Sequence, residues 1–401
     1  SFCPGGSCIK GRVSLVSSCD VREPENIHRP PFPILLTLMD TRSVVTGALA
    51  GAAVATAALL WSQRRVSNST GYPPRGAPNK PGAPVASSSV LARGNVAVIT
   101  GAGTGIGRAV AKRCASLGMK LVLAGDIEED LLRVRDECIG LGASAADVKT
   151  KICDVSCKAD IDALKDLAFR TFSAVHFLMN NAAIQNNGQC GPYEHLDRWE
   201  KTLAVNLWGV VYGCHCFAPA MIAQQQPAVI VNTGSKQGIT APPGDTAYNV
   251  SKTSVKVLTE ALQHTLRSTP GCMVNAFLLV PGWTITMIAT KGNQRLQGQA
   301  WDPKSAQDER SYDGNFDPDY ARQRLEARGA WTAERVVDEL FSAVQTGAPF
   351  YIICPDNETS VNLDKLRMQW SADDLIFRRL PLSRWSEQHK AEFAEVQRLC
   401  V

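Results

Sequence analysis

Long apolar runs are scarce in this 401-residue chain, and only one stretch is long and uncharged enough to cross a bilayer. This excludes a polytopic membrane protein. An excess of charge of one sign is also lacking. There are 42 Lys and Arg against 38 Asp and Glu, with no run of five basic residues, so nothing favours a nucleic-acid partner. The apolar content of 45% is ordinary for a packed core and excludes a wholly disordered chain.

Cysteine and histidine groups at metal-binding spacing are lacking as well. The 13 cysteines are scattered, and the closest pairs, Cys153 with Cys157 and Cys214 with Cys216, have no matching pair elsewhere. We therefore predict no metal site. Scattered thiols indicate reduced cysteines in a reducing compartment.

The first 94 residues differ in texture from the rest. Residues 1–42 show no periodicity, and Met39 begins a stretch that resembles a natural N-terminus, so we expect residues 1–38 to be absent from the mature protein. Residues 43–63 form an apolar segment. Residues 64–94 are rich in Ser, Pro, Gly and Asn and are interpreted as a linker.

The apolar segment 43–63 has three interpretations. As a helix it would reach about 30 Å, the thickness of a hydrocarbon core, which favours a membrane anchor. A cleaved signal or organelle-targeting segment and a soluble Ala-rich helix stay open, because the segment is rich in Ala and Gly rather than Leu. Arg64 and Arg65 follow it and favour a cytosolic C-terminal side. We expect a protein anchored in a membrane with its remaining chain in the cytosol, or one targeted to an organelle.

From residue 95 onward, short β-branched runs alternate with amphipathic segments. Predicted strands cover residues 95–100, 120–124, 148–153, 176–179, 228–232, 273–280 and 350–354. Strands that alternate with helices indicate βαβ units and an α/β, Rossmann-like fold with a doubly wound parallel sheet. One domain over residues 95–356 accommodates them. The tail, residues 357–401, is expected to pack over the edge of the core or to form a subunit contact, and a place in the pocket stays open.

The first predicted strand runs directly into the motif TGAGTGIGRAV at residues 100–110. Glycine permits a positive φ and lets a backbone approach a pyrophosphate, while the following helix N-terminus supplies N–H groups. The motif therefore predicts dinucleotide binding, with a simple tight turn as the alternative. The candidate cofactor-binding residues in it are Gly101, Thr104, Gly105, Ile106 and Gly107.

The G-x-x-x-G-x-G spacing resembles that of the short-chain dehydrogenase/reductase family. Further elements of that family occur in the family's order. They are Asn180-Asn181-Ala182-Ala183 for the NNAG element, Asn206 in VNLWG, Ser235 in VNTGSKQG, Tyr248 and Lys252 in YNVSK, and Pro281, Gly282 and Thr286 in PGWTIT.

The resemblance implies an NAD(P)-dependent alcohol dehydrogenase or carbonyl reductase (EC 1.1.1.-) acting on a small alcohol or carbonyl compound. In the family's arrangement Tyr248 is the acid/base, Ser235 hydrogen-bonds the substrate oxygen, and Lys252 also bonds the nicotinamide ribose. Asn206 holds a water that links Lys252 to solvent. The resemblance further implies a homo-oligomer and a substrate lid over residues 287–329.

The chemistry of the residues themselves agrees with this reading. Tyr248 and Lys252 are four residues apart, so they share one face of a helix. A nearby ammonium favours the phenolate and lowers the pKa of a tyrosine, which suits an acid/base. A complete set at this spacing argues against the alternative function, a dinucleotide-binding sensor or scaffold without turnover.

The choice of cofactor depends on the end of the second strand. The family's usual acidic position falls on Gly125, and Asp126 follows it. A carboxylate there repels a 2′-phosphate, and neither Thr104 nor Ile127 is basic, so NAD is favoured over NADP. Asp154 and Val155 match the pair that flanks the adenine, with a helix N-cap as the alternative for Asp154.

The resemblance also implies cofactor contacts for Asn181, Ala182, Pro281 and Gly282, and places Thr286 at the nicotinamide amide. Trp283, Trp301 and Tyr312 are candidates to line a pocket, with packing within the lid as the alternative. Asn249 begins a glycosylation pattern beside Tyr248, where a glycan would block the site, which argues against secretion.

Overall fold

The computed structural model of the chain describes the region that carries the predicted motifs. All described residues belong to the unit Pro73–Val401. They are residues 89–186, 190–286, 288, 326–327, 329–356 and 359–400. The N-terminal region and the apolar segment lie outside the described residues, as do nearly all of the predicted lid, Trp301 and Tyr312.

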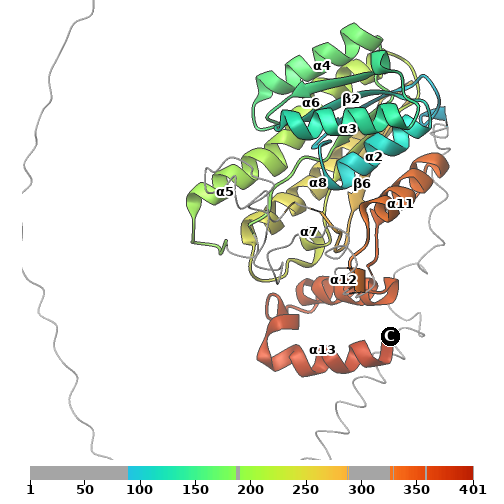
Figure 1. The fold of residues 1–401 in the computed structure, drawn as a ribbon. Coiled ribbons are helices and arrows are strands. Elements are labelled where there is room, and N and C mark those ends of the chain that lie inside the picture. Colours follow the sequence, from blue (N-terminus) through green and yellow to red (C-terminus); the bar gives the residue numbers. More distant parts are fainter. Residues whose placement is uncertain are drawn as a thin grey trace, which may run out of the picture. The chain divides into compact units, whose positions relative to one another are not determined.

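Seven parallel strands form one sheet in the order β3-β2-β1-β4-β5-β6-β7 (Figure 1). All seven match predicted strands, so the predicted α/β fold is confirmed. The chain moves outward from β1 to β3 and then returns to the other side of β1. The carboxyl ends of the neighbouring strands β1 and β4 therefore mark a topological switch point, where open sheets bind ligands. The strands are β1 (Val96–Thr100), β2 (Lys120–Gly125), β3 (Val148–Ile152), β4 (Phe177–Asn180), β5 (Ala228–Thr233), β6 (Val274–Val280) and β7 (Tyr351–Ile353).

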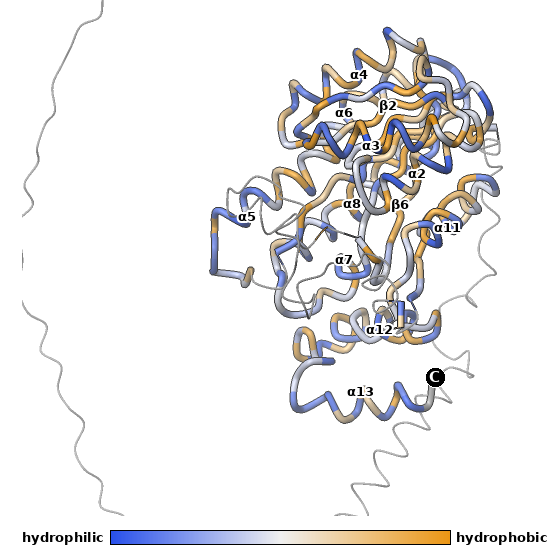
Figure 2. Tube along the Cα trace, viewed as in Figure 1, coloured by the Kyte–Doolittle hydropathy of each residue, from blue (hydrophilic) through white to orange (hydrophobic). Residues whose placement is uncertain are grey.

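Helices cover both faces of the sheet and form two buried clusters. One cluster lies under α2, α3 and α11, and the other lies under α4, α6 and α8. The central strands are buried along their whole length, which is why they read as continuous apolar runs. The helices alternate polar and apolar stretches (Figure 2). Their bounds are α2 (Gly105–Ser116), α3 (Glu128–Gly140), α4 (Lys158–Phe172), α5 (Leu196–Leu203), α6 (Gly209–Ala223), α7 (Gln237–Thr240), α8 (Thr246–Ser268) and α11 (Ala333–Thr346), with short turns η2 (Ala145–Asp147) and η3 (Ala204–Trp208).

The C-terminal tail folds into two helices with a small core of their own, α12 (Val361–Ile376) and α13 (Glu387–Cys400), joined through η4 (Ser383–Trp385). The rings of Trp370 and Phe393 meet edge-on with centroids 5.1 Å apart, and Trp370 Nε1 donates to Ser383 Oγ at 2.7 Å. Helix α12 lies against α7, the short helix that follows Ser235 (Figure 1). The tail thus packs beside the predicted site.

The linker predicted over residues 64–94 extends too far toward the C-terminus. Val90 and Leu91 are buried in the cluster under α2 and α11, and the Asn95 side chain donates to the carbonyls of Ser89 and Val90. Two isolated apolar residues give no periodic signal, so the sequence did not separate them from the polar stretch before them. The folded unit therefore includes residues 89–94.

One helical run among the described residues has the length and hydropathy to cross a membrane. It is Leu196–Ala223, which comprises α5, η3 and α6, and half of its apolar window is buried. Helix α6 packs on the sheet through Phe217 and Met221, as a core helix does. The described residues therefore give no support for a membrane-spanning helix.

Candidate active site

The glycine-rich turn between β1 and α2 has the shape that the motif predicts. Gly101 and Gly105 have φ values of +62° and +53°, which residues with a side chain rarely adopt. A Cβ on Gly107 would lie 2.2 Å from the Gly101 carbonyl oxygen, so strand and helix meet there without room for a methyl group. Thr104 precedes the helix in extended conformation, and Ile106 is buried in its first turn. The turn therefore fits the close approach of a pyrophosphate.

The NNAG-like element is joined directly to this turn. The Thr100 hydroxyl accepts from the backbone N–H of Asn181 at 2.9 Å and of Ala182 at 3.2 Å. The Asn181 side chain donates to the Thr100 carbonyl at 3.1 Å. A Cβ on Gly101 would lie 2.9 Å from Ala182 Cα. The segments that follow β1 and β4 thus lie in direct contact at the switch point.

The segment after β6 reaches the same turn. A Cβ on Gly105 would lie 2.9 Å from Thr286 Cγ2, so Thr286 packs on the glycine turn. Pro281 and Gly282 begin the segment. The Trp331 backbone N–H donates to the Trp283 carbonyl at 2.9 Å, and the Trp331 carbonyl accepts from the Ile285 N–H at 2.8 Å. The structure therefore brings together Thr286 and the glycines, which lie far apart in sequence.

The predicted adenosine side lies at the ends of β2 and β3. Asp126 is exposed directly after β2. Asp154 follows β3, and its Oδ1 accepts from the Ser156 backbone and hydroxyl. Val155 is buried against Gly209, where a Cβ would lie 2.8 Å from the valine side chain. Asp154 therefore organises a local turn. It is not the helix N-cap that was its alternative role, because the N-cap of α4 is Cys157.

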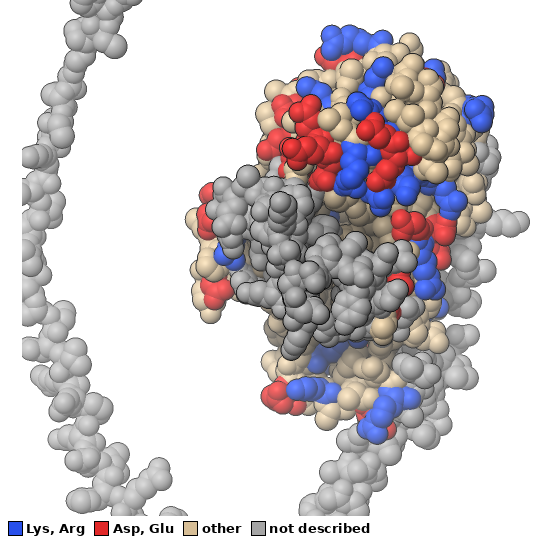
Figure 3. All heavy atoms as spheres, in the orientation of Figure 1, with Lys and Arg blue, Asp and Glu red and all other residues tan. Residues whose placement is uncertain are grey.

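A basic side chain that the sequence did not single out also reaches the glycine turn. Arg133 on α3 donates to the Gly103 carbonyl at 3.0 Å and pairs with Asp130 at 2.7 Å. Positive and negative side chains are interleaved over this part of the surface (Figure 3). An Arg one turn inside the helix after the second strand was a weak sequence signal for this contact.

Ser235, Tyr248 and Lys252 converge beyond the end of β5. The Ser235 side chain lies close enough to the Tyr248 hydroxyl to lower the pKa of the phenol. Lys252 Nζ lies 5.6 Å from the centre of the Tyr248 ring and donates to the Thr233 carbonyl at 2.9 Å. Helix α8 places Tyr248 and Lys252 on one face, as their spacing predicts.

Burial is the largest cause of the pKa shifts of Tyr248 and Lys252. It raises the pKa of Tyr248 to about 12, against the lowering effect of the Ser235 hydrogen bond, and the charge of Asp245 adds to the increase. Burial also lowers the pKa of Lys252 to about 8. The ammonium of Lys252, predicted to lower the phenol pKa, is not among the causes of this shift. Loss of solvent sets its direction, which spacing alone does not reveal.

Asn206 lies in η3, a π-helical turn between α5 and α6. Its side-chain oxygen accepts from Ile184 N at 2.8 Å, and its nitrogen donates to the Ile184 carbonyl at 2.9 Å and to Ser251 Oγ at 3.1 Å. Both amide hydrogens are thus used within the protein. A π-helical turn inside a helix often marks a functional position. The water that Asn206 is predicted to hold would therefore have to bond another atom of this residue, such as its backbone carbonyl.

Asp245 is a site residue that the sequence reasoning missed. It caps α8 by accepting from Tyr248 N at 3.1 Å, and it also accepts from Asn186 N at 2.7 Å and Asn186 Nδ2 at 3.0 Å. This carboxylate therefore fixes the start of the helix that carries Tyr248. The signal was present, because an Asp three residues before the tyrosine is a common N-cap.

The comparisons with known proteins agree with this geometry. A family model of short chain dehydrogenases matches residues 95–297. The Mycobacterium tuberculosis protein SadH is 40% identical over 170 residues, which are 42% of this chain and only 60% of SadH. An uncharacterized oxidoreductase of Staphylococcus aureus is 31% identical over 198 residues, 49% of this chain and 81% of that protein. A short chain dehydrogenase/reductase of Burkholderia phymatum, crystallised with NAD, is 36% identical, has a TM-score of 0.60, and covers 72% of this chain and 96% of its own.

The doubly wound sheet and its glycine turn are those of a dinucleotide-binding fold. The chain belongs to the short-chain dehydrogenase/reductase family of NAD(P)-dependent oxidoreductases.

Proposed function

We propose that this protein moves a hydride between a nicotinamide cofactor and the carbon of an alcohol or carbonyl group, with Tyr248 as the acid/base. The observation that carries the proposal is the convergence of Ser235, Tyr248 and Lys252 beyond β5, with Lys252 Nζ 5.6 Å from the centre of the Tyr248 ring on the same face of α8. The glycine turn leaves room for the pyrophosphate, and Asn181, Ala182, Pro281, Gly282 and Thr286 would hold the rest of the cofactor. When bound, the cofactor supplies or accepts the hydride.

In the direction of reduction, Ser235 and Tyr248 would hold the substrate oxygen between their hydroxyls. As negative charge grows on that oxygen, the Tyr248 hydroxyl donates its proton to it. With its pKa raised to about 12, the phenol is neutral at physiological pH and ready to donate. Lys252, with its pKa near 8, is mostly protonated at pH 7 and would stabilise the phenolate left behind.

The test of the proposal is oxidation of NADH and NADPH in the presence of a panel of aldehydes and ketones. We expect turnover of at least one member, and each cycle should convert one cofactor to its oxidised form. A folded protein that binds the cofactor and turns over no member would instead favour the sensor or scaffold.

We propose that NAD is the preferred cofactor, because Asp126 stands where it would meet the adenosine ribose. Its carboxylate would repel a 2′-phosphate, so we expect NAD(H) to bind at least about tenfold more tightly than NADP(H), a difference of roughly 1.4 kcal/mol. Asp126→Ala should remove most of this difference in titrations with both cofactors. Asp166→Ala, which removes an exposed carboxylate on α4, is the charge-matched control and should leave the ratio unchanged. A wild-type preference for NADP(H) would contradict the assignment to Asp126.

We propose that residues 43–63 act as a membrane anchor or address, and that the catalytic unit folds without them. The described residues begin at Ser89, and the family match begins at residue 95. A chain that starts at Ser88 should therefore be soluble and retain cofactor binding. A chain that starts at Met39 should fractionate with membranes or lose its N-terminus in an organelle. Free, uncleaved protein in the cytosol would contradict the anchor and the targeting segment alike.

A further inference from the structure

A lysine directly after Ser235 is held in a buried ionic bridge. Lys236 Nζ lies 2.6 Å from Asp364 Oδ2 and 3.3 Å from Asp356 Oδ2. The lysine side chain is 13% exposed and each carboxylate 7%. Asp356 follows β7, and Asp364 lies in the first turn of α12. The bridge thus joins the Ser235 turn to the C-terminal tail.

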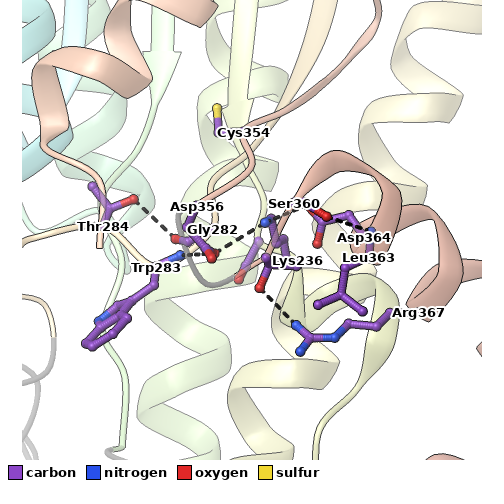
Figure 4. Close-up of polar contacts among 12 residues, drawn as sticks. Lys236, Gly282, Trp283, Thr284, Cys354, Asp356, Ser360, Leu363, Asp364 and Arg367 are labelled. Atoms are coloured by element: carbon purple, nitrogen blue, oxygen red, sulfur yellow. Dashed lines mark hydrogen bonds and ion pairs between the residues drawn. The ribbon is translucent and has the colours of Figure 1, made fainter. Parts of the chain in front are cut away.

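The same bridge supports the segment after β6. Asp356 Oδ2 accepts from the Trp283 backbone N–H at 3.0 Å, and the Lys236 backbone N–H donates to the Pro281 carbonyl at 3.3 Å. A Cβ on Gly282 would lie 2.5 Å from Asp356 Oδ2 and 2.9 Å from Lys236 Nζ. Figure 4 shows Gly282 and Trp283 beside the charged groups. The segment that leads to Thr286 therefore packs directly on the bridge.

Hydrogen bonds hold the chain near both carboxylates, Asp356 just before the tail and Asp364 in its first helix. Asp356 and Thr359 exchange backbone hydrogen bonds, N to O, at 3.4 and 3.1 Å. Ser360 caps α12 by accepting from Leu363 N at 3.2 Å, and Arg367 donates to Thr359 Oγ1 at 3.0 Å. These contacts fix Asp364 and Asp356 relative to each other. The position of Lys236 is therefore determined by the tail.

Stability is a poor explanation for this arrangement. Burying an ammonium and two carboxylates costs much of the attraction that they gain from each other. Burial raises the pKa of Asp364, which shows that its charged form has lost favourable solvation. Such groups are better explained by the fixed geometry that they impose on the segments they join.

We propose that Lys236, Asp356 and Asp364 are positioning residues, which set Ser235 and the segment 281–286 in their working places. The C-terminal helix α12 is then a working part of the active site. The inference rests on the function proposed above for Ser235 and Thr286. The two aspartates lie beyond residues 95–297, the part that matches the family model, so they extend the site past that match.

A second ion pair in the tail supplies a matched control. Asp374 on α12 pairs with Arg379 at 2.9 Å, and the Asp374 side chain is 10% exposed. It also accepts from the Ser383 backbone at 3.0 Å and from the Ser383 hydroxyl at 2.6 Å. Asp374→Asn therefore disturbs a partly buried carboxylate of the same helix that bonds only within the tail.

The experiment compares Asp364→Asn, Lys236→Met, Lys236→Arg and Asp374→Asn in the full chain. We measure kcat and KM at saturating cofactor, thermal unfolding, and hydrogen–deuterium exchange of the segments 234–241 and 281–286. Asp364→Asn and Lys236→Met should lower kcat at least about tenfold, since small misplacement of reacting groups has large effects on rate. Exchange should accelerate in both segments, most directly at the Trp283 N–H. Lys236→Arg keeps the charge between the carboxylates and should restore most of the turnover.

Asp374→Asn should lower the unfolding temperature while its folded form keeps the wild-type kcat and the wild-type exchange in both segments. An equal loss of kcat in Asp374→Asn and Asp364→Asn would overturn the proposal, because the tail would then act through general stability. Unchanged kcat and exchange in Asp364→Asn would overturn it as well. If Lys236→Met does not fold, Asp364→Asn and Lys236→Arg decide alone. If the wild type turns over no substrate, the proposed function fails, and the exchange data still decide whether the bridge fixes the two segments.

Discussion

Tyr248→Phe should lower turnover at least about a hundredfold, the usual contribution of a general acid/base, and leave the fold and the cofactor affinity unchanged. The phenyl ring fills the same buried space and lacks only the hydroxyl that lies near Ser235. No charge is lost at neutral pH, because burial keeps the phenol protonated. The measurements are initial rates with the best carbonyl of the panel, fluorescence titration with NADH, and thermal unfolding.

Tyr212→Phe is the matched control for this change. Tyr212 lies on α6 with its ring 5.7 Å from that of Trp208, and it is not among the predicted site residues. Its loss of a hydroxyl should leave the rate unchanged. A near-normal rate in Tyr248→Phe would remove Tyr248 from the mechanism, whatever the result for the control.

The pH profiles of the wild type and of Tyr248→Phe provide an independent check of the acid/base role. Oxidation of an alcohol needs the phenolate, whose fraction rises about tenfold per pH unit below the pKa of Tyr248. Because that pKa is raised to about 12, the oxidation rate should climb through the neutral range without a plateau. Reduction needs the neutral phenol and should stay level until Lys252 loses its proton near pH 8. The residual rate of Tyr248→Phe should lack the slope in the oxidation direction.

The sheet could be predicted from sequence because its central strands are buried on both faces. Continuous apolar runs such as VAVIT and AVIVNT record this burial directly. Val90 and Leu91 could not be found in the same way. Two apolar residues in a polar stretch have no period, and their burial depends on α2 and α11, which are distant in sequence.

The catalytic residues were predictable because their spacing is local or ordered along the chain. Tyr248 and Lys252 share a helix face, and Ser235 follows a strand by two residues. The direction of the Tyr248 pKa was not predictable, since it depends on how completely the chain excludes water from the ring. The bridge of Lys236 with Asp364 was equally hidden, because its partners are brought together by the sheet and α12 rather than by any repeat or motif.

Gly107→Ala should lower cofactor affinity at least about a hundredfold, and it should also lower the free energy of unfolding by about 1–3 kcal/mol, the usual effect of overpacking. The added methyl group would stand 2.2 Å from the Gly101 carbonyl oxygen and 2.8 Å from Asn181 Nδ2. Helix α2 would have to move away from β1 to relieve this contact. The backbone N–H groups at the start of α2 would move with it, and they are the groups expected to meet the pyrophosphate.

Gly140→Ala separates this steric effect from the ordinary effect of alanine in a helix. Gly140 ends α3, and a Cβ there would meet nothing within 4 Å. Alanine favours a helix over glycine by up to about 1 kcal/mol, so Gly140→Ala should be neutral or slightly stabilising and should bind NADH as the wild type does. At Gly107 the same helical preference favours alanine, and the clash must exceed it for the predicted loss to appear. Titration with NADH and thermal unfolding of both variants measure this balance. Wild-type affinity in Gly107→Ala would show that the turn between β1 and α2 is not the pyrophosphate site.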